Sequence, residues 1–350
     1  MELKIMNSNE ELIGIIDEYK SLIWTRRYYE CGDFELYCKA TSETLALLRT
    51  GNFVARDDDE QICIIEKIQV TTDVENGNYI TAFGRCMKSI LDRRIVWYQT
   101  TLYAQIETLI QIILDKNLIN PSNTDRTIPN FTFENTGTLT DYVEMQMDGD
   151  TIYDVIISVC KQFKYGFAVA LKNGVFTLKL YKGKDRSYAQ TENPYVVFST
   201  DFDNLTQSTY IFNNADYKNV ALVKGEGSGN ERGYYTVGSA TGLERRETFT
   251  DAQSISTNNG AISESNYYQL LSATGNRALS SMKGSENLEG TIIETGQYEY
   301  KKDYFLGDVV QIKNEYGVEA QARIIEIIES DDDTGNRLIP TFSTWEVTPI

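Results

Sequence analysis

The sequence contains no histidine, and this absence excludes several kinds of chemistry together. Without an imidazole there is no Ser-His-Asp or Cys-His nucleophilic site, no histidine ligand for a metal ion and no histidine acid or base. We therefore expect a protein that is not an enzyme, and we predict no catalytic, cofactor-binding or metal-ligating residue.

Features of membrane and exported proteins are missing as well. No apolar run approaches the ~20 residues that a membrane-spanning helix needs, so stable membrane insertion is not expected. The segment Met1–Lys4 lacks the apolar stretch of a signal peptide. The cysteines are five in number and show no C-x-x-C spacing, which indicates reduced thiols in a cytosolically folded protein. They are Cys31, Cys38, Cys63, Cys86 and Cys160.

Basic residues are scarce relative to acidic ones. Lys and Arg number 33 against 51 Asp and Glu, which gives a formal net charge of -18. Such a surface repels phosphates, so sequence-specific nucleic-acid binding is not expected. The short basic segment Lys182–Arg186 contains Asp185 and is interpreted as a solvated hairpin tip.

The composition itself favours a globular β-rich protein. With 350 residues the chain is long enough for two or three domains, and 41% apolar residues can build a sizeable core. Proline occurs only 5 times, against 23 Tyr and 14 Phe. Abundant aromatic residues and few prolines suit sheets.

A β-rich unit occurs twice in the sequence, about 260 residues apart, and whole recurring units are more informative than single similar strands. Each copy has a Gly-led strand, a turn, a second apolar strand and a third strand after a turn with an Asn and a Gly. A chance likeness between two hydrophobic hairpins is the alternative. The matching segments are Gly51–Arg56, Ile62–Ile68 and Ile80–Gly84 in the first copy, and Gly307–Ile312, Ala322–Ile328 and Ile339–Ser343 in the second.

The pattern between the copies changes to helical spacing. Leu102 to Leu114 predicts one helix, and a second begins after Asp150, ends at Phe163 and has Gly166 as its C-cap candidate. Residues 119–137 look like a loop. The pair Asn173-Gly174 predicts a hairpin between Phe167 and Tyr181.

We predict a mainly β fold with an α+β insertion, made of two related β-barrel tube domains and a smaller α/β domain between them. The first barrel takes residues 1–100 and includes a short helix from Ser42 to Leu48, capped by Thr41. The inserted α/β domain takes residues 101–195. The second barrel takes residues 196–350, with one helix near residues 263–282.

Four kinds of candidate site were considered. The Gly-rich loop 225–233 lies between two strands, so it lacks the strand-turn-helix context of a phosphate-binding loop. The acidic runs Asp57–Glu60 and Asp331–Asp333 suit polar turns better than a calcium loop. A carboxylate pair for glycoside hydrolysis cannot be chosen among so many acidic residues. Tryptophans can stack on sugars but more often fill cores, and core positions are expected for Trp24, Trp97 and Trp345.

Several segments together resemble bacteriophage tail-hub proteins, also called tail-associated or baseplate hub proteins. They follow one another in the same order over nearly the whole chain. The segments that carry the resemblance are Ser21–Leu36, Gly84–Arg94, Tyr181–Ser187, Val197–Ser199, Tyr217–Glu226 and Asp303–Val310.

The resemblance implies a structural protein of the virion tail tip, assembled in the bacterial host cytoplasm. Hubs of this kind are homotrimers in which each subunit gives two barrels to a ring, so three subunits meet a six-fold tail tube. Implied partners are the distal tail or tube protein, the tape-measure protein and a tip or fibre protein. The particle would be a phage, a prophage or a phage-derived tailocin, and the hub would join tube to tip and gate the DNA channel.

Two other functions are kept open beside the hub. One is a cell-wall hydrolase that acts on peptidoglycan or another glycan, and the other is a carbohydrate-binding tail component. Longer relatives append receptor-binding or wall-degrading domains. Because the sequence stops at Ile350, directly after the second β-unit, we expect a bare hub that relies on a partner for those activities.

Overall fold

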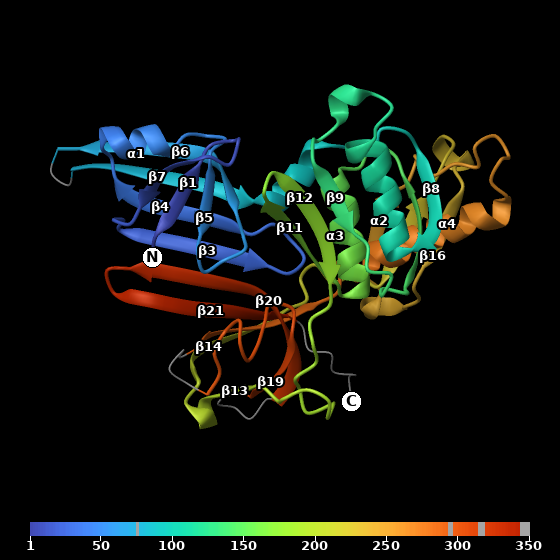
Figure 1. Cartoon of the computed structure of the whole chain (residues 1–350). Coiled ribbons are helices and arrows are strands. Elements are labelled where there is room, and N and C mark those ends of the chain that lie inside the picture. The colour runs from blue at the N-terminus through green and yellow to red at the C-terminus, as the bar shows by residue number, and fades with distance from the viewer. Residues whose placement is uncertain (75–76, 293–296, 314–318, 344–350) are drawn as a thin grey trace.

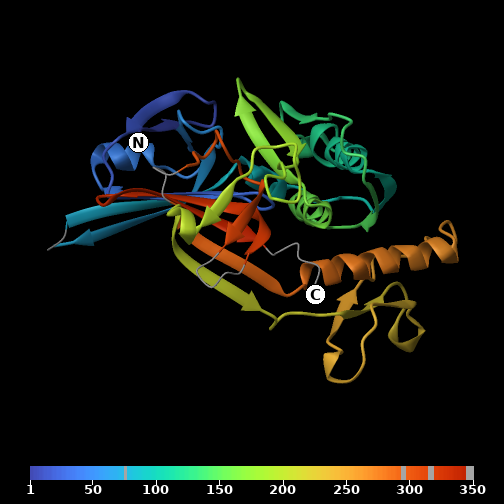
Figure 2. The same ribbon diagram turned by 90° about the horizontal axis from the view of Figure 1, so that it is seen from below.

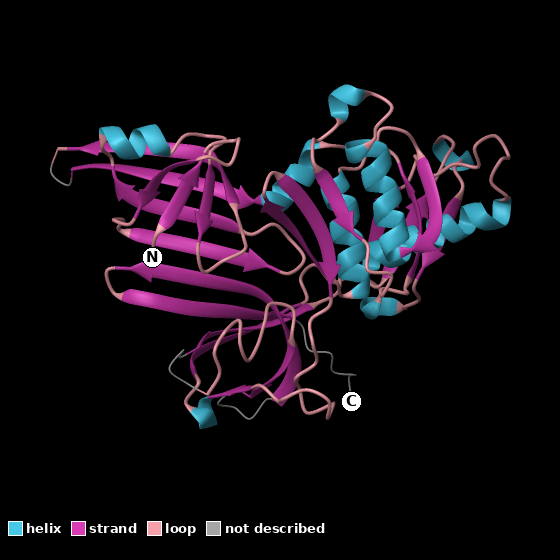
Figure 3. Cartoon of the chain, in the orientation of Figure 1, coloured by secondary structure: helices cyan, strands magenta, loops and turns pink. Residues whose placement is uncertain are grey.

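The computed structural model of the chain describes residues 1–74, 77–292, 297–313 and 319–343 (Figure 1). The chain is mainly β, as predicted, and its strands and helices are shown by type in Figure 3. No helix in these ranges is long and apolar enough to cross a membrane.

One large sheet contains strands from both ends of the chain. Within the described ranges it has 13 strands in the order β14-β18-β21-β20-β3-β4-β7-β6-β5-β1-β2, and β13 and β19 pair beside β20. Its strands are β1 (Leu3–Met6), β2 (Leu12–Ile16), β3 (Ser21–Arg27), β4 (Asp33–Lys39), β5 (Phe53–Arg56), β6 (Cys63–Asp73), β7 (Gly77–Cys86), β13 (Val197–Ser199), β14 (Leu205–Asn213), β18 (Ser285–Ile292), β19 (Val309–Lys313), β20 (Glu319–Asp332) and β21 (Gly335–Ser343).

The duplicated unit predicted from the sequence is confirmed. β5, β6 and β7 pair antiparallel in succession, and β19, β20 and β21 do the same. A glycine with positive φ precedes each first strand: φ is 91° at Gly51 and 96° at Gly307. Each donates its N–H over 2.8 Å to a carbonyl oxygen of the second strand, at Ile65 and at Ile324.

The two copies also share a β-bulge at the same place. In β6 the extra residue is Glu66, between the pairs Ile65–Gly84 and Lys67–Phe83. In β20 the extra residue is Ile325, directly after the equivalent isoleucine. A bulge bends the strand locally and re-aims the residues after it. After its bulge β20 pairs with β3 instead of β19, whereas β6 stops pairing with β5 and, within the described ranges, gains no new strand on that edge.

The predicted short helix is α1 (Ser42–Leu47), and Thr41 caps it. The Thr41 hydroxyl accepts a hydrogen bond from the Thr44 N–H, and the Thr44 side chain accepts one from the Thr41 N–H. This reciprocal pair satisfies two otherwise free donors at the helix start.

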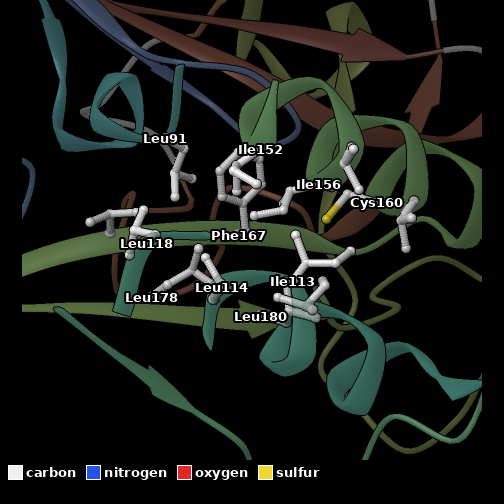
Figure 4. Packing of buried hydrophobic residues seen from close by; sticks show 14 of the residues in the cluster. Leu91, Ile113, Leu114, Leu118, Ile152, Ile156, Cys160, Phe167, Leu178 and Leu180 are labelled. Atoms are coloured by element: carbon white, nitrogen blue, oxygen red, sulfur yellow. The ribbon is translucent and has the colours of Figure 1, made fainter. Parts of the chain in front are cut away.

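The inserted segment forms an α/β part around a hydrophobic core that also includes Phe53 of β5 and Ile64 of β6 (Figure 4). Its elements are β8 (Thr100–Gln105), α2 (Ile106–Leu114), β9 (Phe131–Glu134), β10 (Tyr142–Met147), α3 (Ile152–Phe163), β11 (Gly166–Lys172) and β12 (Val175–Tyr181). β8 pairs with β10, while β11, β12 and β9 make a second small sheet. The predicted hairpin is confirmed, with φ of 52° at Asn173 and 76° at Gly174.

Three expectations for this segment were wrong. Leu102 lies in β8, because alternate residues of a strand can mimic a helical repeat over so short a run. The expected loop 119–137 contains β9, which pairs parallel with β12. The C-cap of α3 is Lys164 in the left-handed region, with φ of 60°, while Gly166 begins β11.

A small separate sheet and a helix follow β14 in the chain. It consists of β15 (Val220–Lys224), β16 (Tyr234–Val237), β17 (Glu247–Asp251) and α4 (Glu264–Ser281). The helix expected near 263–282 is α4, and it covers this small sheet and also touches β10 and α3 (Figure 2). The predicted domain boundaries stay a prediction.

The remaining helical turns are short. They are 3-10 turns except for one π turn: Met87–Arg93, Asp115–Ile119 (π), Thr124–Arg126, Thr200–Phe202, Gly229–Glu231 and Gly242–Glu244.

Candidate functional site

The candidate sites considered from the sequence lie on separate elements of the described part of the chain. The loop 225–233 joins β15 to β16, and Gly225 donates to the carbonyl oxygen of Gly233 over 2.8 Å. It is therefore a closed strand-to-strand connection. Among the described residues, no group of three or more Cys, Asp or Glu side chains is placed to hold a metal ion.

The tryptophans fall in different environments. Trp24 is buried in the core, as predicted. The prediction for Trp97 was wrong: it is 53% exposed, and the Arg126 guanidinium lies 4.8 Å from its ring centroid. Trp345 lies outside the described residues.

The most elaborate polar arrangement lies where the two halves of the chain join. β20 pairs antiparallel with β3 from Glu326–Arg27 to Asp332–Ser21, so the large sheet is continuous across the two halves. In Figure 1 these strands lie side by side below β4.

A buried ion network covers the inner side of the joint. Glu329 of β20 accepts from Arg26 over 2.9 Å and from Arg56 over 2.8 Å. Arg26 also pairs with Asp59, which accepts a 3.1 Å bond from the Trp24 indole. The Arg56 side chain is 1% exposed and the Arg26 and Asp59 side chains 6% each. Buried charges of this kind are tolerated only when paired.

The charges in this network hold one another ionised. Burial alone would raise the pKa of Glu329, but the hydrogen bond from Arg56 and the charge of Arg26 hold it below its usual value. The hydrogen bond from Arg56 likewise lowers the pKa of Asp58. The interpretation of Asp57–Glu60 as an ordinary polar turn was therefore incomplete. This turn supplies two carboxylates, those of Asp58 and Asp59, to the joint.

A second contact ties the inserted segment to the C-terminal half. Asp308 accepts bonds from the Lys184 N–H over 2.7 Å and from the Arg186 Nε over 2.6 Å. The Arg186 and Asp308 side chains are 8% and 3% exposed. The prediction of a solvated tip at Lys182–Arg186 was wrong for Arg186, which is buried and forms a clamp with Asp308, while Lys182 and Lys184 are exposed.

Glycines let the backbones of this clamp approach closely. A Cβ at Gly183 would lie 1.9 Å from the carbonyl oxygen of Gly307. A Cβ at Gly307 would lie 2.2 Å from the ring of Tyr28. Only residues without a side chain fit in these places.

Tyr28 is the side chain at which all three parts of this region meet. It is fully buried, and its N–H donates to Ile325 of β20 over 2.8 Å. Its hydroxyl lies 3.2 Å from the carbonyl oxygen of Lys164 and accepts from the Gly183 N–H over 3.2 Å. Arg323 lies 5.6 Å from its ring centroid. Tyr28 thus contacts the first half, the insertion and the second half.

The segment after β3 is held in place by buried groups at the end of β7 and in the turn Met87–Arg93 that follows it. The Cys31 sulfur lies 3.2 Å from the Cys86 sulfur. The Lys88 Nζ donates to the carbonyl oxygens of Arg27 over 2.7 Å and of Glu30 over 2.8 Å. Burial lowers the pKa of Lys88, yet the surrounding carbonyl oxygens satisfy its donors.

Four of the segments that carry the family resemblance converge on this joint. Ser21–Leu36 supplies Tyr28, Gly84–Arg94 supplies Lys88, Tyr181–Ser187 supplies Arg186, and Asp303–Val310 supplies Asp308. The arrangement joins the two halves and the insertion through buried hydrogen bonds and ion pairs. Sequence reasoning missed it because the partners are distant; Arg26 and Glu329 are 303 residues apart.

Comparison with protein-family models matches the Siphovirus ReqiPepy6 Gp37-like protein family over residues 2–343. A search of curated protein sequences gives no match.

Three solved structures share the fold of the chain. The 43 kDa tail protein of prophage MuSo2 from Shewanella oneidensis is 15% identical, with 98% of both chains covered and a TM-score of 0.58. The tail protein from Neisseria meningitidis MC58 is 10% identical, with 98% of this chain and 96% of that one covered and a TM-score of 0.59. Prophage tail protein gp18 from Listeria monocytogenes EGD-e is 12% identical, with 99% and 96% covered and a TM-score of 0.56.

Proposed function

Because the chain belongs to the Siphovirus ReqiPepy6 Gp37-like protein family, a family of siphovirus tail proteins, we propose that it is the structural hub of a tail tip or baseplate. In this role three copies form a pseudo-six-fold ring in the virion. The ring joins the tail tube to the tip and gates the DNA channel. Its partners are a distal tail or tube protein, a tape-measure protein and a tip or fibre protein.

The observation that carries this proposal is the duplicated unit within one sheet. The sheet order contains two equivalent sets, β14-β18-β21-β20 and β3-β4-β7-β6, joined at β20 and β3. Rings close when the same contact repeats around an axis. Three copies supply six equivalent sets, which is the symmetry that a six-fold tube requires at its end.

The side of the sheet turned away from the core suits a channel for DNA. There Arg27 is bonded to Asp33 and Glu326, and Arg85 is bonded to Glu66. Cations that are already paired with carboxylates hold phosphates weakly. A channel lined by this side would let DNA slide, in keeping with the net charge of -18.

The exposure of Trp97 favours a second candidate, a carbohydrate-binding tail component. An exposed indole can stack on a sugar ring, although Arg126 lies over the Trp97 ring. Quenching of tryptophan fluorescence by cell-wall polysaccharide, lost in Trp97→Phe, would support that candidate. Unchanged fluorescence in the presence of the polysaccharide would exclude it.

The hub proposal is tested by the absolute mass of the purified chain in solution. Light scattering over a range of concentrations is expected to give a species of three times 39.8 kDa, and electron microscopy of that species is expected to show rings with a central hole. A chain that remains a monomer at every concentration, alone and with its purified tube protein, would refute the ring.

A further inference from the structure

We propose that the free edge of β6 in one copy receives β14 of a neighbouring copy, and that this contact repeats the β20–β3 joint already present inside the chain. The inference rests on the proposed ring and identifies the surface by which it closes. The occupant is a second copy of this chain, added head to tail.

The two strands concerned have unpaired edges at opposite ends of the eight-strand run. β5 pairs with β6 only at Cys63 and Ile64, so within the described ranges the outer edge of Lys67–Thr72 has no partner strand. β14 pairs with β18 on one side and with no described strand on the other. In Figure 1 the hairpin of β6 and β7 lies at the top of the sheet and β14 near its bottom. Unpaired edges are templates for another strand.

The repeat shows what the edge of β6 is built to receive. After its bulge, β20 pairs with β3 through Glu326–Asp332. After its equivalent bulge, β6 continues as Lys67–Asp73, a stretch of the same length. The edge that β20 uses inside the chain is therefore present again on β6, without its partner.

The matching strand is found by following one row across each half of the sheet. In the first half, Lys67 is the first residue after the bulge and lies opposite Phe83. Phe83 lies opposite Glu35, and Glu35 lies opposite Ile23 of β3.

The same row in the second half leads to β14. Glu326 is the first residue after the bulge and lies opposite Thr341. Thr341 lies opposite Glu289, and Glu289 lies opposite Thr209. Thr209 of β14 therefore occupies the place that Ile23 has in β3.

This equivalence fixes the register of the proposed contact. Inside the chain Ile327 lies opposite Arg26. Ile68 holds the place of Ile327, and Phe212 holds the place of Arg26, so Ile68 of one copy lies opposite Phe212 of the next. Val70 then lies opposite residue 210.

The apolar side chains at these positions are exposed in the single chain, whereas those of the internal joint are buried. Ile68, Val70 and Phe212 are 38%, 49% and 60% exposed, whereas their counterparts Ile327 and Arg26 inside the chain are 0% and 5% exposed. Exposed apolar side chains gathered on a strand edge mark an interaction surface. Pairing the edges would bury them as the internal joint buries its own.

A cysteine cross-link tests the register. In the double variant Ile68→Cys, Phe212→Cys, mild oxidation is expected to link residue 68 of one copy to residue 212 of another, up to a closed three-chain species. Mixing isotopically light and heavy chains before oxidation identifies links between copies by peptide mass spectrometry. The matched control is Val70→Cys, Phe212→Cys. Residue 70 lies on the same face of β6 as residue 68 but two residues further along, so this pair is expected to cross-link at least tenfold less.

A charge substitution tests the same contact without a cross-link. Phe212→Lys is expected to convert the three-copy species to monomers while leaving the thermal midpoint of the monomer unchanged, since Phe212 is exposed in the single chain. Phe249→Lys, at a side chain 56% exposed on β17, is the control that keeps the ring.

The outcomes separate the two proposals. Three-copy rings without the 68–212 link, or rings that persist in Phe212→Lys, would overturn the β6–β14 contact and leave the hub standing. A chain that forms no ring at all would overturn both.

Discussion

The shared carboxylate of Glu329 offers the sharpest test of the joint between the halves. Replacing it with glutamine keeps the shape of the side chain and removes the charge that faces Arg26 and Arg56. Removing one partner of a buried ion pair costs about 3–5 kcal/mol. Each arginine retains a second carboxylate, Asp59 or Asp58, so we expect a smaller loss of about 2–4 kcal/mol in the free energy of unfolding.

The measurement is chemical denaturation at pH 7, followed by tryptophan fluorescence, which includes Trp24 beside the network. The control is Glu326→Gln, because the Glu326 side chain is 21% exposed and pairs with Arg27 at the edge of the joint. An ion pair with this much solvent contact contributes about 1 kcal/mol or less. Equal losses in the two variants would show that burial of the network is not what stabilises the joint.

The same carboxylate predicts a pH dependence. The pKa of Glu329 is lowered in the folded chain from its usual value of 4.5, so the charged form stabilises the fold. That contribution is complete above the unfolded value and is lost as the pH falls through the lower folded value. The stability difference between the natural chain and Glu329→Gln should therefore be constant near neutrality and shrink below about pH 4.5. A difference that grows on acidification would contradict the reasoning.

Four further outcomes are expected. Gly183→Ala should lower the thermal midpoint and cost at least about 2 kcal/mol, because its Cβ would overlap a facing carbonyl oxygen at 1.9 Å. Lys88→Met should cost about 2–4 kcal/mol in denaturation, because it leaves buried carbonyl oxygens without a donor. Hydrogen peroxide should oxidise the Cys86 thiolate to a sulfenic acid, which Cys31 then attacks to form a disulfide and release water. Burial opposes this thiolate, but the Cys31 hydrogen bond and Lys88 lower the pKa of Cys86 to about 7, so peptide mapping should find the 31–86 link forming faster above pH 7 than below it and absent in Cys31→Ser. Trp97→Ala should change the unfolding free energy by less than about 1 kcal/mol, since the side chain is half exposed, and a larger loss would show that it packs in the folded chain.

Sequence patterns were sufficient wherever the determinant was local or repeated. Thr41 was identified as a helix cap because its hydroxyl acts three residues away. The hairpin at Asn173-Gly174 follows from the left-handed conformation that these residues tolerate. The duplicated unit was visible because its apolar strands recur as a group, down to the glycine that opens each copy.

Sequence patterns failed where the determinant was a distant partner. Nothing local distinguishes Arg186 from a solvated arginine, because the carboxylate that buries it belongs to Asp308 in the other half. Asp59 resembles any acidic turn residue until Arg26 and the Trp24 indole are brought to it. Leu102 failed for a different reason: over one turn, a strand and a helix can present the same apolar spacing.

The joint between β3 and β20 can form only after β20 has been synthesised, long after β3. Residues that meet there, such as Arg26 and Glu329, are 303 positions apart, so at about 5–20 residues per second the ribosome needs roughly 15–60 s to deliver the second after the first. Throughout that interval β3 stands as an open edge beside finished strands, and a neighbouring nascent chain is a competitor for it. An unpaired strand edge can pair with another chain, so pairing of β3 with a neighbouring chain is the outcome that competes with its closure by β20.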